Sequence, residues 1–207
     1  MVMKNFTLSA LFMLIAGTFT AFAGNPVTLV SFYSVYNYLP QVTYVENHGV
    51  VDGKVIQFLL DETAAIDEKA AVINALTTHN ELKRNALTYR QFLARKYGVH
   101  FQVLDAGQLL PEEAFCLGYL ELMDQQGDPA TALPWLEKAA TTKPESQTIQ
   151  VIYQLAQAES LIREKKPCEA WELFNNSALQ SGFNSDMAPE IINTIKESFA
   201  EYRSDCE

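Results

Sequence analysis

Apolar residues recur at the spacing of an amphipathic helix through the second half of the chain, and turn residues separate the runs. Proline at the start of three runs favours helix there, because the first helical position needs no backbone N–H. The pattern predicts five consecutive helices: from Pro111 to a stop at Gly127, from Pro129 to a stop at Lys143-Pro144, from about Ser146 to Glu164, from Pro167 to the region of Gly182, and from Ser185 to about Tyr202.

The same pattern occurs twice, in residues 111–148 and again in residues 149–186. Identical residues return 38 positions later in five pairs: Leu117 and Leu155, Glu121 and Glu159, Pro129 and Pro167, Ala132 and Ala170, and Ala140 and Ala178. A fixed period of this size is typical of helical repeat arrays, in which each unit leaves an apolar face for its neighbour. The final helix has one polar side and is predicted to cap the array.

Residues 24–110 are predicted to form an N-terminal helical region with less regular patterning. We expect helices over 25–39 (ended by Pro40), 55–60, 67–76 and 81–97 (capped by Asn80 and ended by Gly98). Residues 41–60 alternate Val and Tyr around an Asp-Gly pair, so a helix and a short β-hairpin are both open there. Residues 99–104 are expected to be extended. No low-complexity linker divides the chain, which indicates one elongated all-α domain.

The first 23 residues are predicted to be a secretory signal peptide. Lys4 precedes an uncharged apolar stretch that ends in a small-x-small cleavage signal, Ala21-Phe22-Ala23. The stretch is short for a stable membrane span, and no later segment is long enough either. The protein is therefore expected to be exported, to the periplasm or the medium, with a mature chain that begins at Gly24.

Charge and cysteine content narrow the expected chemistry. The formal net charge is −10, and an acidic excess disfavours binding to nucleic acid or to anionic membranes. In an oxidising compartment, three cysteines allow one internal bridge. The last two predicted helices should run antiparallel, which brings Cys168 and Cys206 together and leaves Cys116 reduced in the core.

The sequence has no recognisable spacing of catalytic or metal-binding side chains. His48, His79 and His100 are not at metal-binding spacing, and the chain has no nucleophile, metalloprotease or phosphate-loop motif. Paired carboxylates such as Glu112-Glu113 stand at predicted helix starts, where they complement the helix dipole. We therefore expect no enzyme activity, no metal and no cofactor.

Residues 117–144 resemble a tetratricopeptide repeat, in its longer Sel-like form. The resemblance rests on the Leu117-Gly118 pair in the first helix and on small or apolar residues at set places in the second, namely Ala132, Leu136 and Ala139, followed by Pro144 in the exit turn. It implies antiparallel helix pairs stacked as a short right-handed array in residues 111–207, with a concave face for a peptide or protein partner.

A tyrosine-rich block is the most unusual feature of the N-terminal region. Tyr33, Tyr36 and Tyr38 either pack against the next helix or form a surface for a partner or a sugar. Phe115 and Tyr119 of the first repeat are further candidate binding residues. The leading hypothesis is an exported, non-enzymatic scaffold that binds a protein or peptide; the alternative is a cell-envelope accessory protein that binds glycans through the tyrosine block.

Overall fold

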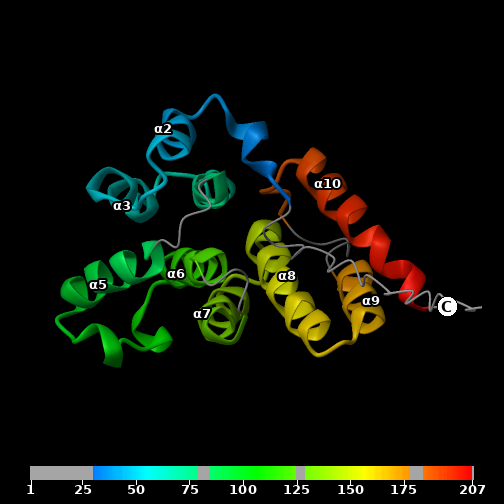
Figure 1. Ribbon diagram of the computed structural model, residues 1–207. Coiled ribbons are helices and arrows are strands. Elements are labelled where there is room, and N and C mark those ends of the chain that lie inside the picture. The colour runs from blue at the N-terminus through cyan, green and yellow to red at the C-terminus, as the bar shows by residue number, and fades with distance from the viewer. Residues whose placement is uncertain (1–29, 79–83, 125–128, 178–183, 207) are drawn as a thin grey trace, which may run out of the picture.

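The computed structural model describes residues 30–78, 84–124, 129–177 and 184–206, and these residues are helical throughout apart from their connections (Figure 1). The predicted all-α class is confirmed. The first half contains η1 (Phe32–Tyr36), α2 (Pro40–His48), α3 (Gly53–Leu60), α4 (Ile66–Ala75), η2 (Leu76–Thr78), α5 (Asn85–Tyr97), η3 (Phe101–Val103) and η4 (Ala106–Gln108). The predicted signal peptide lies outside the described residues.

The second half is a series of helices, of which α6 to α9 pack on one another in chain order. They are α6 (Pro111–Asp124), α7 (Pro129–Thr142), α8 (Gln147–Arg163), α9 (Pro167–Ser177), α10 (Pro189–Phe199) and η5 (Ala200–Cys206). α6 packs on α7, α7 on α8 and α8 on α9. The turn from α8 to α9 is tight, and Lys165 adopts a left-handed backbone there, with φ of 63°.

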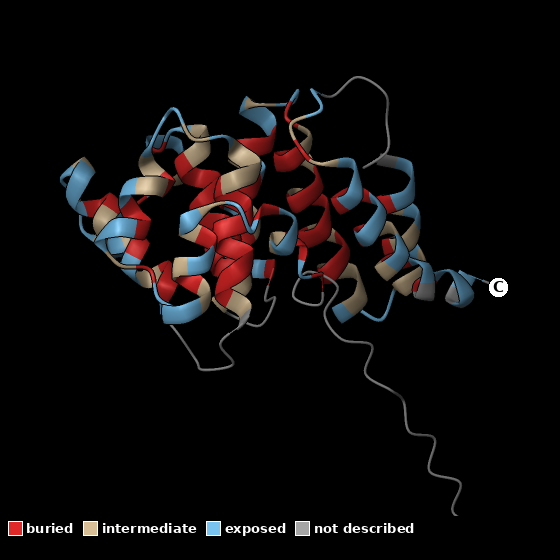
Figure 2. Ribbon diagram, turned by 90° about the horizontal axis from the view of Figure 1, so that it is seen from above, coloured by how far each residue is buried: buried red, intermediate tan, exposed pale blue. Residues whose placement is uncertain are grey.

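The N-terminal part of the described chain lies close to its C-terminal part. η1 lies beside α10 (Figure 1). α4 fills the centre of this arrangement and packs against η1, α6 and α8. Every residue of α4 from Lys69 to Ala75 is buried, and Figure 2 shows the buried residues gathered in the middle of the molecule. A helix that is buried on all sides forms the core of the domain.

Buried Asn74 of α4 ties three segments together. Its Oδ1 accepts a hydrogen bond from the backbone N of Tyr33 (3.2 Å). Its Nδ2 donates to the backbone O of Val30 and to the hydroxyl of Tyr119, each at 3.1 Å. The side chain thereby fixes the entry to η1 against both α4 and α6. Burial of this amide costs little free energy of folding, since its oxygen and its nitrogen both have hydrogen-bond partners.

The two alternatives for residues 41–60 are resolved in favour of helix. α2 ends at His48 and is capped by Gly49, whose φ of 62° is left-handed, and α3 begins after Asp52. The Asp52 carboxylate accepts hydrogen bonds from the backbone N of Lys54 and of Val55 and so caps α3. The Asp-Gly pair therefore starts a helix here instead of turning a hairpin.

Several other N-terminal predictions were wrong in detail. Pro40 begins α2 instead of ending a helix, and the described part of the segment 25–39 contains only the 3-10 turn η1. Residues 99–104 include the 3-10 turn η3 where an extended segment was expected. The helix expected over 81–97 begins at Asn85, after a non-helical Arg84, while residues 79–83 are outside the described part.

The start of α5 is capped by a residue from another helix. Asp124, at the end of α6, accepts a hydrogen bond at 2.6 Å from the backbone N of Ala86. Burial, opposed by that bond, raises the pKa of Asp124 to about 6. The carboxyl therefore ionises at a higher pH in the folded chain than in the unfolded chain, where its ordinary pKa is about 3.9.

Replacing Asp124 with Asn should flatten the dependence of stability on pH. With a raised folded-state pKa, the contribution of Asp124 to stability is fully present below pH ~4 and is lost as pH rises through ~6. Asn keeps an acceptor for Ala86 without the charge, so Asp124→Asn should be more stable at pH 7 by about 1 kcal/mol, after allowance for partial exposure. Urea midpoints from pH 4 to 7 measure this difference. A loss of stability at pH 7 would show that attraction of the charge to the α5 dipole outweighs burial.

The C-terminal helix starts later than predicted, at Pro189 instead of Ser185. Asp186 instead caps the start of α8. Its Oδ1 accepts from the backbone N of Thr148 (2.8 Å) and its Oδ2 from the Ser146 hydroxyl (2.6 Å). The Thr148 hydroxyl in turn donates to the backbone O of Asp186 (2.8 Å). These bonds hold the segment before α10 against α8.

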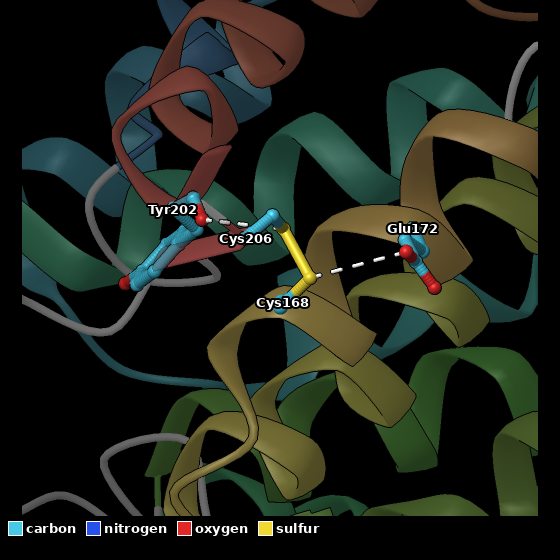
Figure 3. Close-up of a disulfide and its surroundings, with 4 residues drawn as sticks. All are labelled: Cys168, Glu172, Tyr202 and Cys206. Atoms are coloured by element: carbon cyan, nitrogen blue, oxygen red, sulfur yellow. Dashed lines mark hydrogen bonds between the residues drawn. A yellow bond between two sulfur atoms is a disulfide. The ribbon is translucent and has the colours of Figure 1, made fainter. Parts of the chain in front are cut away.

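The predicted disulfide between Cys168 and Cys206 is confirmed, with 4.9 Å between the two Cα atoms. Figure 3 shows Cys168 at the start of α9 bonded to Cys206 of η5, beyond Tyr202. Cys116 is a free, buried thiol, as expected. Next to the bridge, the Phe174 ring stacks on Phe199 with 4.5 Å between centroids. The bridge therefore holds the end of the chain over an aromatic cluster.

Gly118 lies where α6 approaches α7 most closely. A Cβ at this position would come within 2.7 Å of Leu136 Cγ and 3.0 Å of the Leu136 backbone N. The presence of Ala156 at the equivalent place in the second copy suggests that Gly118→Ala is mild. The close approach in the structure argues against this, because even a methyl group would press on the Leu136 side chain and lie tight against its backbone N, so that Leu136 must shift.

We therefore expect Gly118→Ala to destabilise the fold by about 1–3 kcal/mol and Gly118→Leu by more, since overpacking forces backbone shifts. Gly53→Ala is the matched control, because a Cβ at Gly53 has no atom within 4 Å. Thermal melts of the three variants compare the sites. A Gly118→Leu protein with the parent's melting temperature would contradict the close packing of α6 on α7.

Candidate functional site

The concave face expected from the repeat resemblance is not open. Phe115 is 0% exposed and Tyr119 is 1% exposed. α4 packs directly on α6, and the hydroxyl of Tyr119 accepts the bond from Asn74 described above. The chain's own α4 thus covers these two candidate binding residues, which belong to the core. Sequence periodicity could not show this, because an apolar helix face can be covered either by a partner molecule or by another helix of the same chain.

The tyrosine-rich block divides between core and surface. Phe32 and Tyr36 are buried, Tyr33 is half-buried, and Val35 and Tyr38 are exposed, at 41% and 68%. A 3-10 turn has three residues per turn, so neighbouring side chains point in different directions. Each of the two predicted alternatives therefore holds for part of the block. Tyr36 packs in the core, whereas Tyr38 lies on the surface.

A surface pocket of about 370 Å³ lies beside this block. It is formed by η1, the start of α4 and the segment that leads into α10. Its lining residues are Val35, Tyr36, Tyr38, Asp67, Ser185, Asp186, Met187, Ala188 and Pro189. Two of the predicted binding residues, Tyr36 and Tyr38, meet here, and Tyr33 is not among the lining residues. The apolar side chains around it include two of the large hydrophobic residues that are exposed, Val35 and Tyr38.

Asp67 forms the acidic side of the pocket. It stands in the first turn of α4, where a carboxylate is favoured by the helix dipole. The Tyr36 hydroxyl donates a hydrogen bond of 2.6 Å to Asp67 Oδ2. Burial, and then this bond, raise the pKa of Tyr36 far above its ordinary value. Tyr36 therefore stays protonated and holds Asp67 in place.

Tyr38 lies at the mouth of the same pocket. The pKa of the Tyr38 hydroxyl is raised. The largest cause is partial loss of hydration, and the negative charges of Glu68 and Asp67 add smaller contributions. Its ring centroid is 6.0 Å from that of Tyr36. An exposed aromatic ring held next to a carboxylate can accept apolar, aromatic or cationic groups on its face.

The opposite side of the pocket is the segment 185–189, which Asp186 anchors to α8. Both carboxylate oxygens of Asp186 accept bonds from the start of α8, so this wall is firmly placed. Met187 is buried beneath it. No local pattern indicates that this segment, more than a hundred residues along the chain, lies beside the tyrosine block, since only the fold brings the two together.

The pocket carries negative charge that no ion pair in the described chain offsets. Four carboxylates elsewhere in the helices have cationic partners: Glu112 with Lys69, Glu113 with Lys96, Glu121 with Arg90 and Glu159 with Arg163. Among the described residues, Asp67 and Asp186 have hydrogen bonds but no such cation. The described lining includes no Lys or Arg.

Other candidate chemistry remains scattered. His48 Nδ1 lies 2.8 Å from the backbone O of Tyr44, His100 caps η3, and His79 is outside the described residues. Within the described ranges no three His, Cys, Asp or Glu side chains are grouped to hold a metal ion. Burial raises the pKa of Cys116 to about 12, so this thiol is a poor nucleophile. Among the helices described, none has both the length and the apolar character to cross a bilayer.

No protein-family model matches this chain, and comparison with curated proteins and with solved structures gives no match. The similarity of residues 117–144 to a tetratricopeptide repeat therefore stays a prediction from the residues themselves.

Proposed function

We propose that this protein is an exported helical scaffold that binds a protein or peptide partner at the pocket beside η1. The observation that carries the proposal is the exposure of Val35 and Tyr38 at the mouth of that pocket. Aromatic side chains are enriched in protein interfaces, where a ring fills a pocket or covers one. A small pocket with an aromatic edge suits one anchoring side chain of a larger partner.

Two further features support the exported scaffold. The disulfide between Cys168 and Cys206 is a bond that persists in oxidising compartments. The pocket walls are fixed by the Tyr36–Asp67 bond and by the Asp186 cap. A preorganised surface loses little conformational entropy on binding, which favours a stable partner complex.

Site-specific photo-crosslinking tests the proposal. Benzoylphenylalanine at position 38 should give one discrete crosslinked product in the cells that export the protein. The same group at Val103, which is 66% exposed on η3, is the matched control and should give none. Added mature protein should compete for the crosslink, and mature protein with Tyr38→Ala should not. Equal yields at both positions would contradict a partner site at the pocket.

Binding of a glycan is the second candidate, favoured by the combination of the Tyr38 ring with the Asp67 carboxylate. Sugars stack on aromatic faces and donate hydroxyl bonds to carboxylates. A glycan array read with the parent and with Tyr38→Ala distinguishes the two functions. Signal that is lost in Tyr38→Ala, together with no crosslinked protein at position 38, would favour the glycan.

A further inference from the structure

We propose that the pocket anchors a cationic side chain, Arg or Lys, of a peptide segment in the partner. This inference rests on the proposed function and specifies the chemistry of the partner at the same site. The occupant has two parts, an apolar stem and a positively charged end. Each part matches a group of residues around the pocket.

The charged end matches the carboxylate of Asp67. Tyr36 donates one hydrogen bond to Asp67 Oδ2, and no cation of the described chain pairs with this carboxylate. In contrast, the helix carboxylates of Glu112, Glu113, Glu121 and Glu159 each have a Lys or Arg of their own. Asp186 adds negative charge on the opposite wall, although its oxygens are engaged by α8. An incoming cation would therefore meet an acidic pocket with no competing positive charge among its described lining residues.

The stem matches the apolar residues at the mouth. Val35 and Pro189 lie on two sides of the pocket, and the exposed ring of Tyr38 stands near the acidic group. Lys and Arg side chains lay their methylene groups along apolar surfaces while their charged ends reach a polar partner. Tyr38 can also receive a cation over its ring face. An acidic side chain would be repelled here, and a purely apolar one would desolvate the Asp67 carboxylate without supplying a positive charge to compensate it.

Peptide selection tests this inference. A random heptapeptide phage library is panned against the mature parent and against Asp67→Asn, which keeps an acceptor for the Tyr36 hydroxyl. The parent should enrich Arg and Lys, and peptides from that pool should bind Asp67→Asn about tenfold more weakly. Tyr38→Ala should also weaken them. Binding to the parent should weaken with added salt, because the contact is a partly exposed charge pair.

Two controls separate a specific anchor from general attraction to an acidic protein. Glu137→Gln removes one exposed charge from α7, outside the pocket lining, and should leave the enrichment of Arg and Lys unchanged. Val35→Lys places a cation at the mouth without altering Asp67 and should abolish the enrichment. If Glu137→Gln loses as much binding as Asp67→Asn, the anchor is overturned.

The outcomes also separate this inference from the proposed function. Selected peptides without Arg or Lys that still need Tyr38 would overturn the cationic anchor and leave peptide binding in place. No selected peptide and no crosslink at position 38, with glycan binding lost in Tyr38→Ala, would overturn both.

Discussion

Removing residues 186–207 should leave a chain that does not fold cooperatively and that aggregates. The deletion removes six buried side chains from α10, η5 and the segment that leads into α10, which are Met187, Ile191, Ile192, Ile195, Phe199 and Tyr202. Each fully buried apolar side chain contributes about 1.5–3 kcal/mol, whereas a whole domain is stable by only about 5–15 kcal/mol. It also uncovers Phe174, removes the Asp186 cap of α8 and deletes one half of the disulfide.

Circular dichroism during thermal unfolding and size-exclusion chromatography measure this outcome. A shorter deletion, of residues 203–207, is the matched control. It removes Cys206 but keeps Phe199 and Tyr202, so it should lose only the contribution of the disulfide and remain folded. A soluble 1–185 chain with a sharp unfolding transition would show that α10 is dispensable for the core.

Replacing Cys168 and Cys206 together with Ala should lower the free energy of unfolding by about 3–4 kcal/mol, because the bridge closes a loop of 38 residues in the unfolded chain. The folded state should otherwise persist, since Phe174, Phe199 and Tyr202 still pack on one another. The midpoint of urea unfolding should fall to that of the reduced parent. Equal midpoints for the oxidised parent and the double variant would show that the bridge adds no stability.

Thiol titration provides the accompanying control. The oxidised parent should show one thiol after denaturation, from Cys116, and none in the native state, because that thiol is buried and its pKa is raised to about 12. Three thiols should appear only after reduction. A native protein that reacts at Cys116 would indicate local opening of α6.

The positions of most of the helices in the second half could be predicted from the sequence alone, because they depend on residues that are close together in the chain. Hydrophobic spacing and proline positions predicted α6 to α9 closely, because helix formation is decided by local periodicity and by residues at helix ends. The bridge from Cys168 to Cys206 was predicted because a short connection between helices restricts their relative direction. Local signals left two structures open at Asp52-Gly53, because an Asp-Gly pair is found both at helix starts and in hairpin turns, and the structure has the helix there.

Only the tertiary structure decided which apolar surfaces are available. Phe115 and Tyr119 have the residue types of a binding face, but α4 covers them, and no local pattern states which distant segment will cover a helix. The pocket joins Tyr38, Asp67 and Pro189, which are widely separated along the chain. Helix formation is a local property of the sequence, whereas burial and pockets depend on contacts between segments that only the folded chain brings together.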